Sequence, residues 1–554
     1  MKKFLGARPI ILIVILALAA ILRFWNLGGV PPSASLDEAS IGYNAYSVLK
    51  TGGDEYGEFP IISQRGYDDW RRSIYLFLVV PFVALFGLNA AAVRLPAVIL
   101  SILTVWATYR IVLLLFSKRS EFSSNVAFLA SFLLAISPWH IYISRLGHES
   151  NACLSFLVFG ALLFLKGVNQ KSFSKVLLSM VFFTLSMISY YSGQAFIPLF
   201  AAGLFFIFRK NLLSIITSDK KVLIPFFAFL ILLVPIFWTI FSPQALVRFQ
   251  GTSTFKPEVH SKEFARRVEL RNKAVEKNDI VGTILYNRRL FPAQVFIEGY
   301  IAHFKPQWLF TNSSGEPFKV PNMGLLYLWE IPFIVIGIAA LLFSRVLDRQ
   351  AKKLIFLWFF LAPLPAAIAT QAPHAMRSYN FLPTWQIFTA FGLAYLFYKL
   401  PKFKILTFSA FALFILVSLA AFYKNYFIVF PKEQSSSFQY ALSKTIPYVL
   451  SQQKNYQKVV ISNSDNLYQS YMFYLFYSKY DPKLYQKQGG TISGGYAENH
   501  KFDNLFFEPI NFKEDSGSKG TLYVGNPNEF SKNISPIKTF RNLNGEEAII
   551  VVAK

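Results

Sequence analysis

Two adjacent carboxylates follow the first apolar segment of the chain. The stretch SLDEAS places Asp37 and Glu38 shortly after an apolar run that ends near Trp25. A carboxylate in this position can accept the proton of an attacking hydroxyl group as a general base. The pair can equally start a helix, because Ser35 stands three residues before Glu38, as in a capping box. The residue types alone leave both roles open.

Other ionisable side chains gather near the ends of further apolar segments. They are Arg71 and Arg72 in YDDWRRSIY, Arg145, His148 and Glu149 in SPWHIYISRLGHESN, and His374 and Arg377 in QAPHAMRSYN. Ionisable groups at the edge of a bilayer are costly, so such clusters are candidates for function. The alternatives are structural: Arg71 and Arg72 as head-group anchors, and the later arginines as span-end residues that reach for water.

This set of residue types suits the transfer of a group from a lipid-linked phosphate. Arginine forks can hold a phosphate with two parallel hydrogen bonds and stabilise the charge that grows on it as it leaves. A scaffold within the bilayer leaves the donor's hydrocarbon tail in lipid. The sequence contains no glycine-rich phosphate loop, so a nucleotide-sugar donor is not expected.

Composition places these residues in a membrane protein. Of 554 residues, 54% are hydrophobic and only 15% are charged. The net charge of +25 fits basic cytoplasmic loops and anionic membrane lipids, and no motif points to nucleic acid. The single cysteine, Cys153, excludes an intrachain disulfide and a cysteine-based metal site.

Apolar segments long enough to cross a bilayer predict eleven spans. The first is expected to stay as a membrane anchor and not to be cleaved. The uncharged run 176–208 is too long for one span and should break at residues 190–193, whereas the short segment 73–86 should lie on the outer surface. The predicted spans are 8–27, 91–116, 124–143, 150–166, 173–190, 195–208, 222–241, 323–344, 354–370, 379–398 and 405–428.

The distribution of basic residues predicts the orientation. Counted from a cytoplasmic amino terminus, every inner loop carries Lys or Arg, as the positive-inside rule requires. The fold expected is an all-α polytopic bundle over 1–430 in the cell membrane, with outer loops 28–90 and 242–322. Strand-like runs in the polar tail predict a small extracytoplasmic α/β domain over 431–554.

Several motifs in this order resemble one family. They are the acidic pair, the block YDDWRRSIYLFLVVPFVALFGLNAAAVRLPAVI, SPWHIYISRLGHESN, HFKPQWLF, VPNMGLLYLWEIPF and PHAMRSYNFLP. Together they resemble bacterial membrane glycosyltransferases related to protein O-mannosyltransferases and to lipid A aminoarabinose transferases. The resemblance covers roughly residues 1–400. It implies a GT-C fold, with an outer-face active site that takes a hexose or pentose from a polyprenyl-phosphate donor.

The resemblance also implies roles for individual residues. Asp37, with Glu38 beside it, corresponds to the catalytic base, and Glu149 to a second acidic position. The family's Lys-Pro-Pro-Leu-Tyr segment corresponds to 71–75 here, where Arg71 keeps the charge but the prolines are missing. His374 and Arg377 correspond to phosphate-binding positions.

The resulting hypothesis is that Arg377, with Arg71 or Arg72, binds the donor phosphate while Asp37 deprotonates an acceptor hydroxyl. His148 and Glu149, with Arg145 nearby, would bind substrate or a divalent cation, and the sequence does not decide whether a metal is needed. The acceptor, whether protein, lipid or glycan, is also left open. A lipid-linked sugar transporter and a non-catalytic assembly protein are the rival functions.

Overall fold

The computed structural model describes residues 2–67, 69–116, 120–218, 242, 261–311, 318–400, 402, 404–492, 495, 498–512, 519–531 and 533–554. The chain divides into two compact units. The first unit comprises Met1–Leu16, Leu103–His140 and Cys153–Ile415, and the second comprises Ala17–Ile102, Ile141–Ala152 and Leu416–Lys554.

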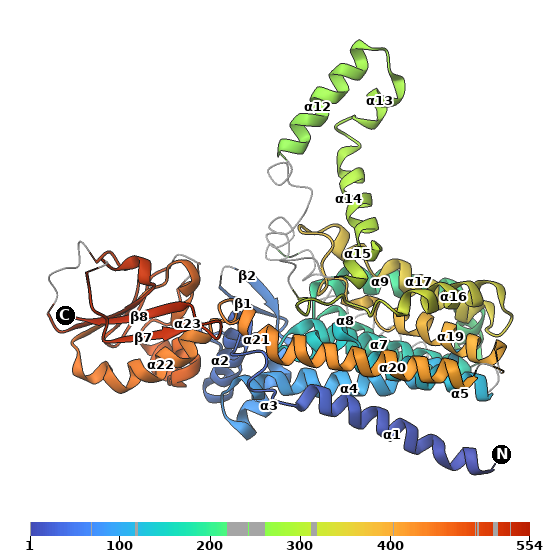
Figure 1. The fold of residues 1–554 in the computed structure, drawn as a ribbon, viewed down its shortest axis with the longest axis horizontal. Coiled ribbons are helices and arrows are strands. Elements are labelled where there is room, and N and C mark those ends of the chain that lie inside the picture. The colour runs from blue at the N-terminus through green and yellow to red at the C-terminus, as the bar shows by residue number, and fades with distance from the viewer. Residues whose placement is uncertain are drawn as a thin grey trace. The chain divides into compact units, whose positions relative to one another are not determined.

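Long apolar helices make the chain a multi-pass integral membrane protein (Figure 1). In the described part, four helices are long and apolar enough to cross a membrane, or five if the bent pair α5 and α6 forms one span. These are α4 (Ala90–Leu115), α7 (Glu149–Asn169), α9 (Tyr191–Ser218), the stretch Phe408–Glu433 around α20 (Lys404–Phe422), and the pair α5 (Glu121–Ile136) and α6 (Pro138–Ser144). Shorter apolar helices include α1 (Lys2–Phe24), α3 (Ile74–Phe86), α8 (Phe173–Met187) and α16 (Glu330–Phe343).

The helices follow most of the predicted segmentation. The uncharged run breaks where the sequence indicates, because α8 ends at Met187 and α9 begins at Tyr191. The short segment after Ser73 is the separate helix α3. The predicted span 222–241 lies outside the described residues, as does part of the outer loop 242–322. The full count of eleven spans therefore remains a prediction.

Two glycines bring helices close together in the first unit. Here α16 packs against α19 (Thr384–Lys399), with α17 (Arg349–Leu361) also beside α19. A Cβ atom on Gly337 would collide with the carbonyl oxygen of Phe388, and one on Gly392 with that of Phe333. Small residues at such crossings let helix backbones approach closely, which is typical of packing inside membranes.

The second unit contains a mixed β-sheet at the carboxyl-terminal end of the chain (Figure 1). Its strand order is β4-β5-β3-β6-β8-β7, with β3 parallel to β5 and β6 and the remaining pairs antiparallel. The strands are β3 (Lys458–Ile461), β4 (His500–Phe502), β5 (Leu505–Phe507), β6 (Thr521–Gly525), β7 (Lys538–Arg541) and β8 (Glu547–Ala553). The helices α22 (Tyr440–Gln452), α23 (Ser470–Ser478) and α24 (Pro482–Lys487) belong to the same domain.

The first long loop and this carboxyl-terminal domain pack together as parts of the second unit. Helix α2 (Leu36–Thr51) contacts α3, α23 and α24. Gly42 on α2 is wedged so tightly that an added Cβ would come within 2.6 Å of the Phe476 ring and 2.7 Å of Val93. The hydroxyl of Tyr43 donates to the carbonyl of Tyr480 at 3.3 Å. The carboxyl-terminal domain thus positions α2.

A buried carboxylate, Glu55, joins the two segments. It is fully buried and accepts hydrogen bonds from Asn44 Nδ2 at 3.0 Å, Thr491 Oγ1 at 2.7 Å and the Tyr471 hydroxyl at 3.1 Å. Burial raises the pKa of Glu55 to about 7, although the hydrogen bonds from Asn44 and Thr491 act in the opposite direction. The three described side-chain partners are an amide and two hydroxyls, so none of them neutralises the carboxylate.

This geometry predicts how the stability of the second unit depends on pH. Because the folded pKa of Glu55 lies above its ordinary value of 4.5, the folded state keeps the proton after the unfolded chain has lost it. The stabilisation is complete below the unfolded pKa and disappears as the pH rises through about 7, an effect of up to about 3 kcal/mol. Glu55→Gln should therefore raise the thermal unfolding temperature relative to wild type at pH 8.

The control for this prediction is Glu58→Gln, which changes an exposed carboxylate in the same loop. Thermal unfolding in detergent, measured between pH 5 and 8, should give a difference between Glu55→Gln and wild type that grows with pH. A difference that stays constant over this range, or that Glu58→Gln reproduces, would contradict a buried carboxylate with a raised pKa.

Candidate functional site

The two adjacent acids at the start of α2 have different surroundings. The Ser35 hydroxyl accepts from the backbone N–H of Glu38, and the Glu38 carboxylate accepts from the backbone N–H of Ser35, which completes the capping box. Successive side chains on a helix point about 100° apart. As a result, the Asp37 side chain is 45% exposed and the Glu38 side chain is 1% exposed.

Glu38 forms a buried ion pair with Arg94 of α4. The Arg94 Nε lies 2.7 Å from Glu38 Oε1, and Arg94 Nη2 donates to Oε2 at 2.9 Å. The backbone N–H of Gly147 donates to Oε1 at 2.8 Å, and that of Ser35 to Oε2 at 2.8 Å. Both carboxylate oxygens of Glu38 therefore already accept two hydrogen bonds each, which suits a positioning role.

The rest of the Arg94 guanidinium binds the turn that follows α1. Its nitrogens donate to the backbone carbonyls of Leu27, Pro31 and Ser33 at 2.6–3.1 Å. Arg94 lies within the AAAVRLP part of the family block, but no pattern in the sequence singles it out from other span-end arginines. Only the fold brings it to Glu38, a residue 56 positions away.

Asp37 pairs with Arg71 on the other side of the helix start. Arg71 Nη2 lies 2.5 Å from Asp37 Oδ1, and the guanidinium lies over the Tyr67 ring, 5.2 Å from its centroid. The Tyr67 hydroxyl donates to the carbonyl of Leu36 at 2.9 Å. Burial alone would lower the pKa of Arg71, but the nearby Asp37, Tyr67 and Glu149 raise it. Asp37, the predicted general base, is thus in direct contact with Arg71, a predicted phosphate ligand.

A short hairpin explains why the two neighbouring arginines differ. Arg71 and Arg72 end β2 (Asp69–Arg72), which pairs antiparallel with β1 (Ser63–Gly66). Successive side chains of a strand point to opposite faces. Arg71 contacts Asp37, whereas Arg72 is buried and donates to the Ser63 hydroxyl at 2.9 Å.

Tyr468 of the carboxyl-terminal domain lies within electrostatic reach of Asp37. Burial, followed by the electrostatic effect of Asp37, raises the pKa of its phenol. Tyr468 keeps 37% of its surface exposed. It follows η7 (Asp465–Leu467), and the sequence offers no pattern that links this tail segment to the first loop.

Arg145 binds the carboxyl-terminal end of α1. Its two terminal nitrogens donate to the carbonyls of Leu22, Arg23, Asn26 and Val30 at 2.6–3.3 Å. Cations at helix carboxyl termini stabilise carbonyls that lack intrahelical partners. This arrangement favours the structural role that the sequence leaves open for Arg145.

His148 and Glu149 lie at the start of α7, close to this network. His148 Nε2 is 3.3 Å from Glu149 Oε2, and His148 Nδ1 accepts from the backbone N–H of Ser150 at 3.1 Å. Glu149 contributes to the raised pKa of Arg71, so the two charges are within electrostatic reach. Within the described ranges, no three His, Cys, Asp or Glu side chains form a group that could hold a metal ion.

His374 and Arg377 belong to the first unit, in the loop before α19. His374 Nδ1 accepts from the backbone N–H of Arg377 at 3.3 Å, and Arg377 Nη1 donates to the carbonyl of Thr370 at 2.5 Å. His303 Nε2 accepts from the backbone N–H of His374 at 3.2 Å. The Phe318 ring lies 5.4 Å from the His374 ring, measured between centroids. The next residue, Lys319, is a buried cation that no motif in the sequence singles out.

Comparison with protein families tests the predicted resemblance. Residues 74–238 match the family described as dolichyl-phosphate-mannose-protein mannosyltransferase. The predicted family resemblance is confirmed. The match includes α3, α4 and the segment from Arg145 to Glu149, and it supports the class of membrane glycosyltransferases. Among curated protein sequences, none matches this chain.

Solved structures of ArnT show a similar fold. ArnT from Cupriavidus metallidurans in the apo state is 10% identical with a TM-score of 0.53, and 97% of each chain is covered. The same protein bound to undecaprenyl phosphate is 12% identical with a TM-score of 0.53, over 100% of this chain and 98% of that one. For the Archaeoglobus fulgidus oligosaccharyltransferase tethered with an acceptor peptide, the identity is 15% and the TM-score 0.48. The comparison covers 85% of this chain but only 63% of the archaeal protein.

The buried Glu38–Arg94 ion pair is expected to stabilise the folded protein. Arg94→Met should lower the free energy of unfolding by about 3–5 kcal/mol, because it leaves the Glu38 carboxylate buried without its cation. The double variant Glu38→Met/Arg94→Met should recover part of this loss, since both charges are then removed. Thermal unfolding in detergent measures both effects.

The matched control is Arg110→Met, a partly exposed arginine on the same helix. An unfolding temperature for Arg94→Met equal to that of the control would show that the pair does not hold the site together.

Proposed function

We propose that this chain is an integral-membrane glycosyltransferase that moves a sugar from a polyprenyl-phosphate donor to an acceptor hydroxyl on the outer face of the membrane. The observation that carries the proposal is the partly exposed Asp37 carboxylate in contact with Arg71. It stands on a helix whose start is held by the buried Glu38–Arg94 pair. The family match over 74–238 supports the same class of reaction.

In the proposed reaction, Asp37 is the general base. Its carboxylate takes the proton of the acceptor hydroxyl while the acceptor oxygen forms a bond to the anomeric carbon of the sugar. The bond from that carbon to the phosphate oxygen breaks, and the electron pair leaves with the polyprenyl phosphate. Attack from the face opposite the leaving group inverts the anomeric carbon.

Arg71 keeps the base ready for this step. An opposite charge in contact with a carboxylate favours its ionised form, which is the form that a general base needs. In this proposal Arg71 also stabilises negative charge on the leaving phosphate. Arg377 and His374 in the first unit remain the proposed phosphate ligands, and Glu149 a proposed substrate contact.

Substitution of the two adjacent acids should separate chemistry from structure. Asp37→Asn should reduce sugar transfer by about 10²–10⁴-fold, the range for losing a general base, with little change in stability. Glu38→Gln should lower the unfolding temperature, because it weakens the buried pair. Transfer is measured by mass spectrometry of products formed from short-chain polyprenyl-phosphate sugars by the purified protein.

The control variant is Asp348→Asn, an exposed acid outside both candidate clusters. Full transfer by Asp37→Asn would exclude Asp37 as the base. If no donor of a broad panel supports transfer by the wild type while vesicle assays show movement of a lipid-linked sugar, the protein is a transporter.

The phosphate role of Arg377 gives a separate prediction. Arg377→Met should weaken binding of polyprenyl phosphate by about tenfold to a hundredfold, because a charge-assisted fork contributes about 1.5–3 kcal/mol. Tryptophan fluorescence titration of the purified protein measures this affinity. Arg266→Met changes an exposed arginine and is expected to bind as wild type does. Unchanged affinity in Arg377→Met would remove it from the phosphate site.

A further inference from the structure

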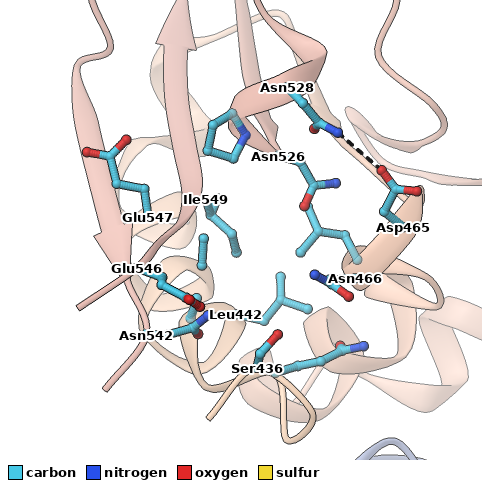
Figure 2. A pocket seen from close by; sticks show the side chains of 15 residues that line it. Ser436, Leu442, Asp465, Asn466, Asn526, Asn528, Asn542, Glu546, Glu547 and Ile549 are labelled. Carbon is cyan, nitrogen blue, oxygen red and sulfur yellow. Dashed lines mark hydrogen bonds between the residues drawn. The ribbon is translucent and has the colours of Figure 1, made fainter. Parts of the chain in front are cut away.

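The carboxyl-terminal domain contains a cavity that the proposed chemistry does not use. Its volume is about 340 Å³, at the lower end of the roughly 300–1,000 Å³ typical of small-molecule sites. Figure 2 shows Asp465, Asn466 and Asn526 on one side, with Asn542 and Glu546 facing them. Leu442 lies between these two sides.

The cavity lies where the sheet topology favours ligand binding. Asn526 directly follows β6, and Asp465 lies shortly after the end of the parallel neighbour β3. Glu547 begins the antiparallel strand β8, so it lies at the same end of the sheet as the carboxyl end of β6. Ligands of open α/β sheets bind beyond the carboxyl ends of parallel strands, because the connecting loops there leave a crevice.

The lining is rich in amides and carboxylates. Besides the acids Asp465, Glu546 and Glu547, it carries Gln439, Asn466, Asn526, Asn528 and Asn542. Among the described residues that line it there is no lysine or arginine. The acid Glu547 is paired with Arg541, with 2.6 Å between Glu547 Oε1 and Arg541 Nη2. Side-chain amides both donate and accept hydrogen bonds, as sugar hydroxyls do, whereas acids repel phosphate. The chemistry fits an uncharged, hydroxyl-rich ligand.

One buried group in this cavity has an unused acceptor. Only 6% of the Gln439 surface is exposed, and in the described structure its side-chain oxygen accepts no hydrogen bond. Leaving a buried acceptor unsatisfied costs about 1–3 kcal/mol, so such atoms are uncommon without a function. Gln439 also has a left-handed backbone, with φ of 48°, as does Asp465 across the cavity with φ of 50°. Strained backbone of this kind clusters at binding sites.

We infer that this cavity is a saccharide-binding site for an uncharged mono- or disaccharide unit. The buried Gln439 side chain turns toward the cavity so that its oxygen accepts from a ligand hydroxyl, and the asparagine amides at the rim hold further hydroxyls. Recognition rests on hydrogen bonds, since no aromatic ring is among the lining residues that the structure describes. The site is separate from the residues proposed for transfer, so binding is measured without turnover.

Saturation-transfer NMR on the purified full chain tests this inference. The probes are methyl glycosides of glucose, galactose, mannose and N-acetylglucosamine, and the corresponding disaccharides. At least one probe should bind, and Gln439→Leu and Asn466→Ala should each weaken its binding about fivefold to tenfold. Asn455→Ala, an exposed asparagine of the same domain outside the cavity, should leave the affinity unchanged.

Two further measurements keep the result interpretable. Asn466 is exposed at the rim, so its variant tests the site even if Gln439→Leu fails to fold. Asp37→Asn should bind the saccharide as wild type does, which distinguishes failure of this site from failure of the transferase proposal. No binding of any probe, or binding that both cavity variants leave unchanged, would overturn the inference. Binding of inorganic phosphate in place of the sugars would overturn it as well.

Discussion

The ion pair between Glu38 and Arg94 is the constraint on which the candidate site depends. Removing two charges from water costs several kcal/mol for each ion, and only complete hydrogen bonding compensates for this cost. Here Glu38 accepts from the Arg94 guanidinium and from two backbone N–H groups, and Arg94 also binds three carbonyls of the turn after α1. One buried contact therefore ties α2, α4, Gly147 and this turn together.

Tight packing around the pair determines where the neighbouring acid can point. A Cβ atom on Gly147 would come within 2.7 Å of Val93 and 3.2 Å of the Glu38 side chain, so the backbone must approach closely there. With Glu38 turned inward, the helical rotation of about 100° directs Asp37 toward Arg71. The two adjacent acids therefore have different roles, since Glu38 is buried and fixes the start of α2 whereas Asp37 stays accessible.

The carboxyl-terminal domain takes part in building this site. Helix α2 packs on α23 and α24, Glu55 accepts hydrogen bonds from Tyr471 and Thr491, and Tyr468 lies within electrostatic reach of Asp37. The domain that supplies these residues also carries the cavity around Gln439. A role for the domain in recognising a saccharide is consistent with both features, because one fold then presents a sugar site and supports the proposed base.

The sequence by itself determined the membrane class, the helix break between α8 and α9, the strands β3, β6 and β8 of the tail and the family resemblance. These follow from local hydrophobicity, turn residues and motif order, which act over short distances. It also placed Asp37, Arg71 and Glu149 among the candidates. Only the tertiary structure decided that Glu38 pairs with Arg94, that Arg145 binds the end of α1, and that Tyr468 approaches Asp37. Such partners lie tens to hundreds of residues apart in the sequence. The packing of the whole fold determines which of them meet.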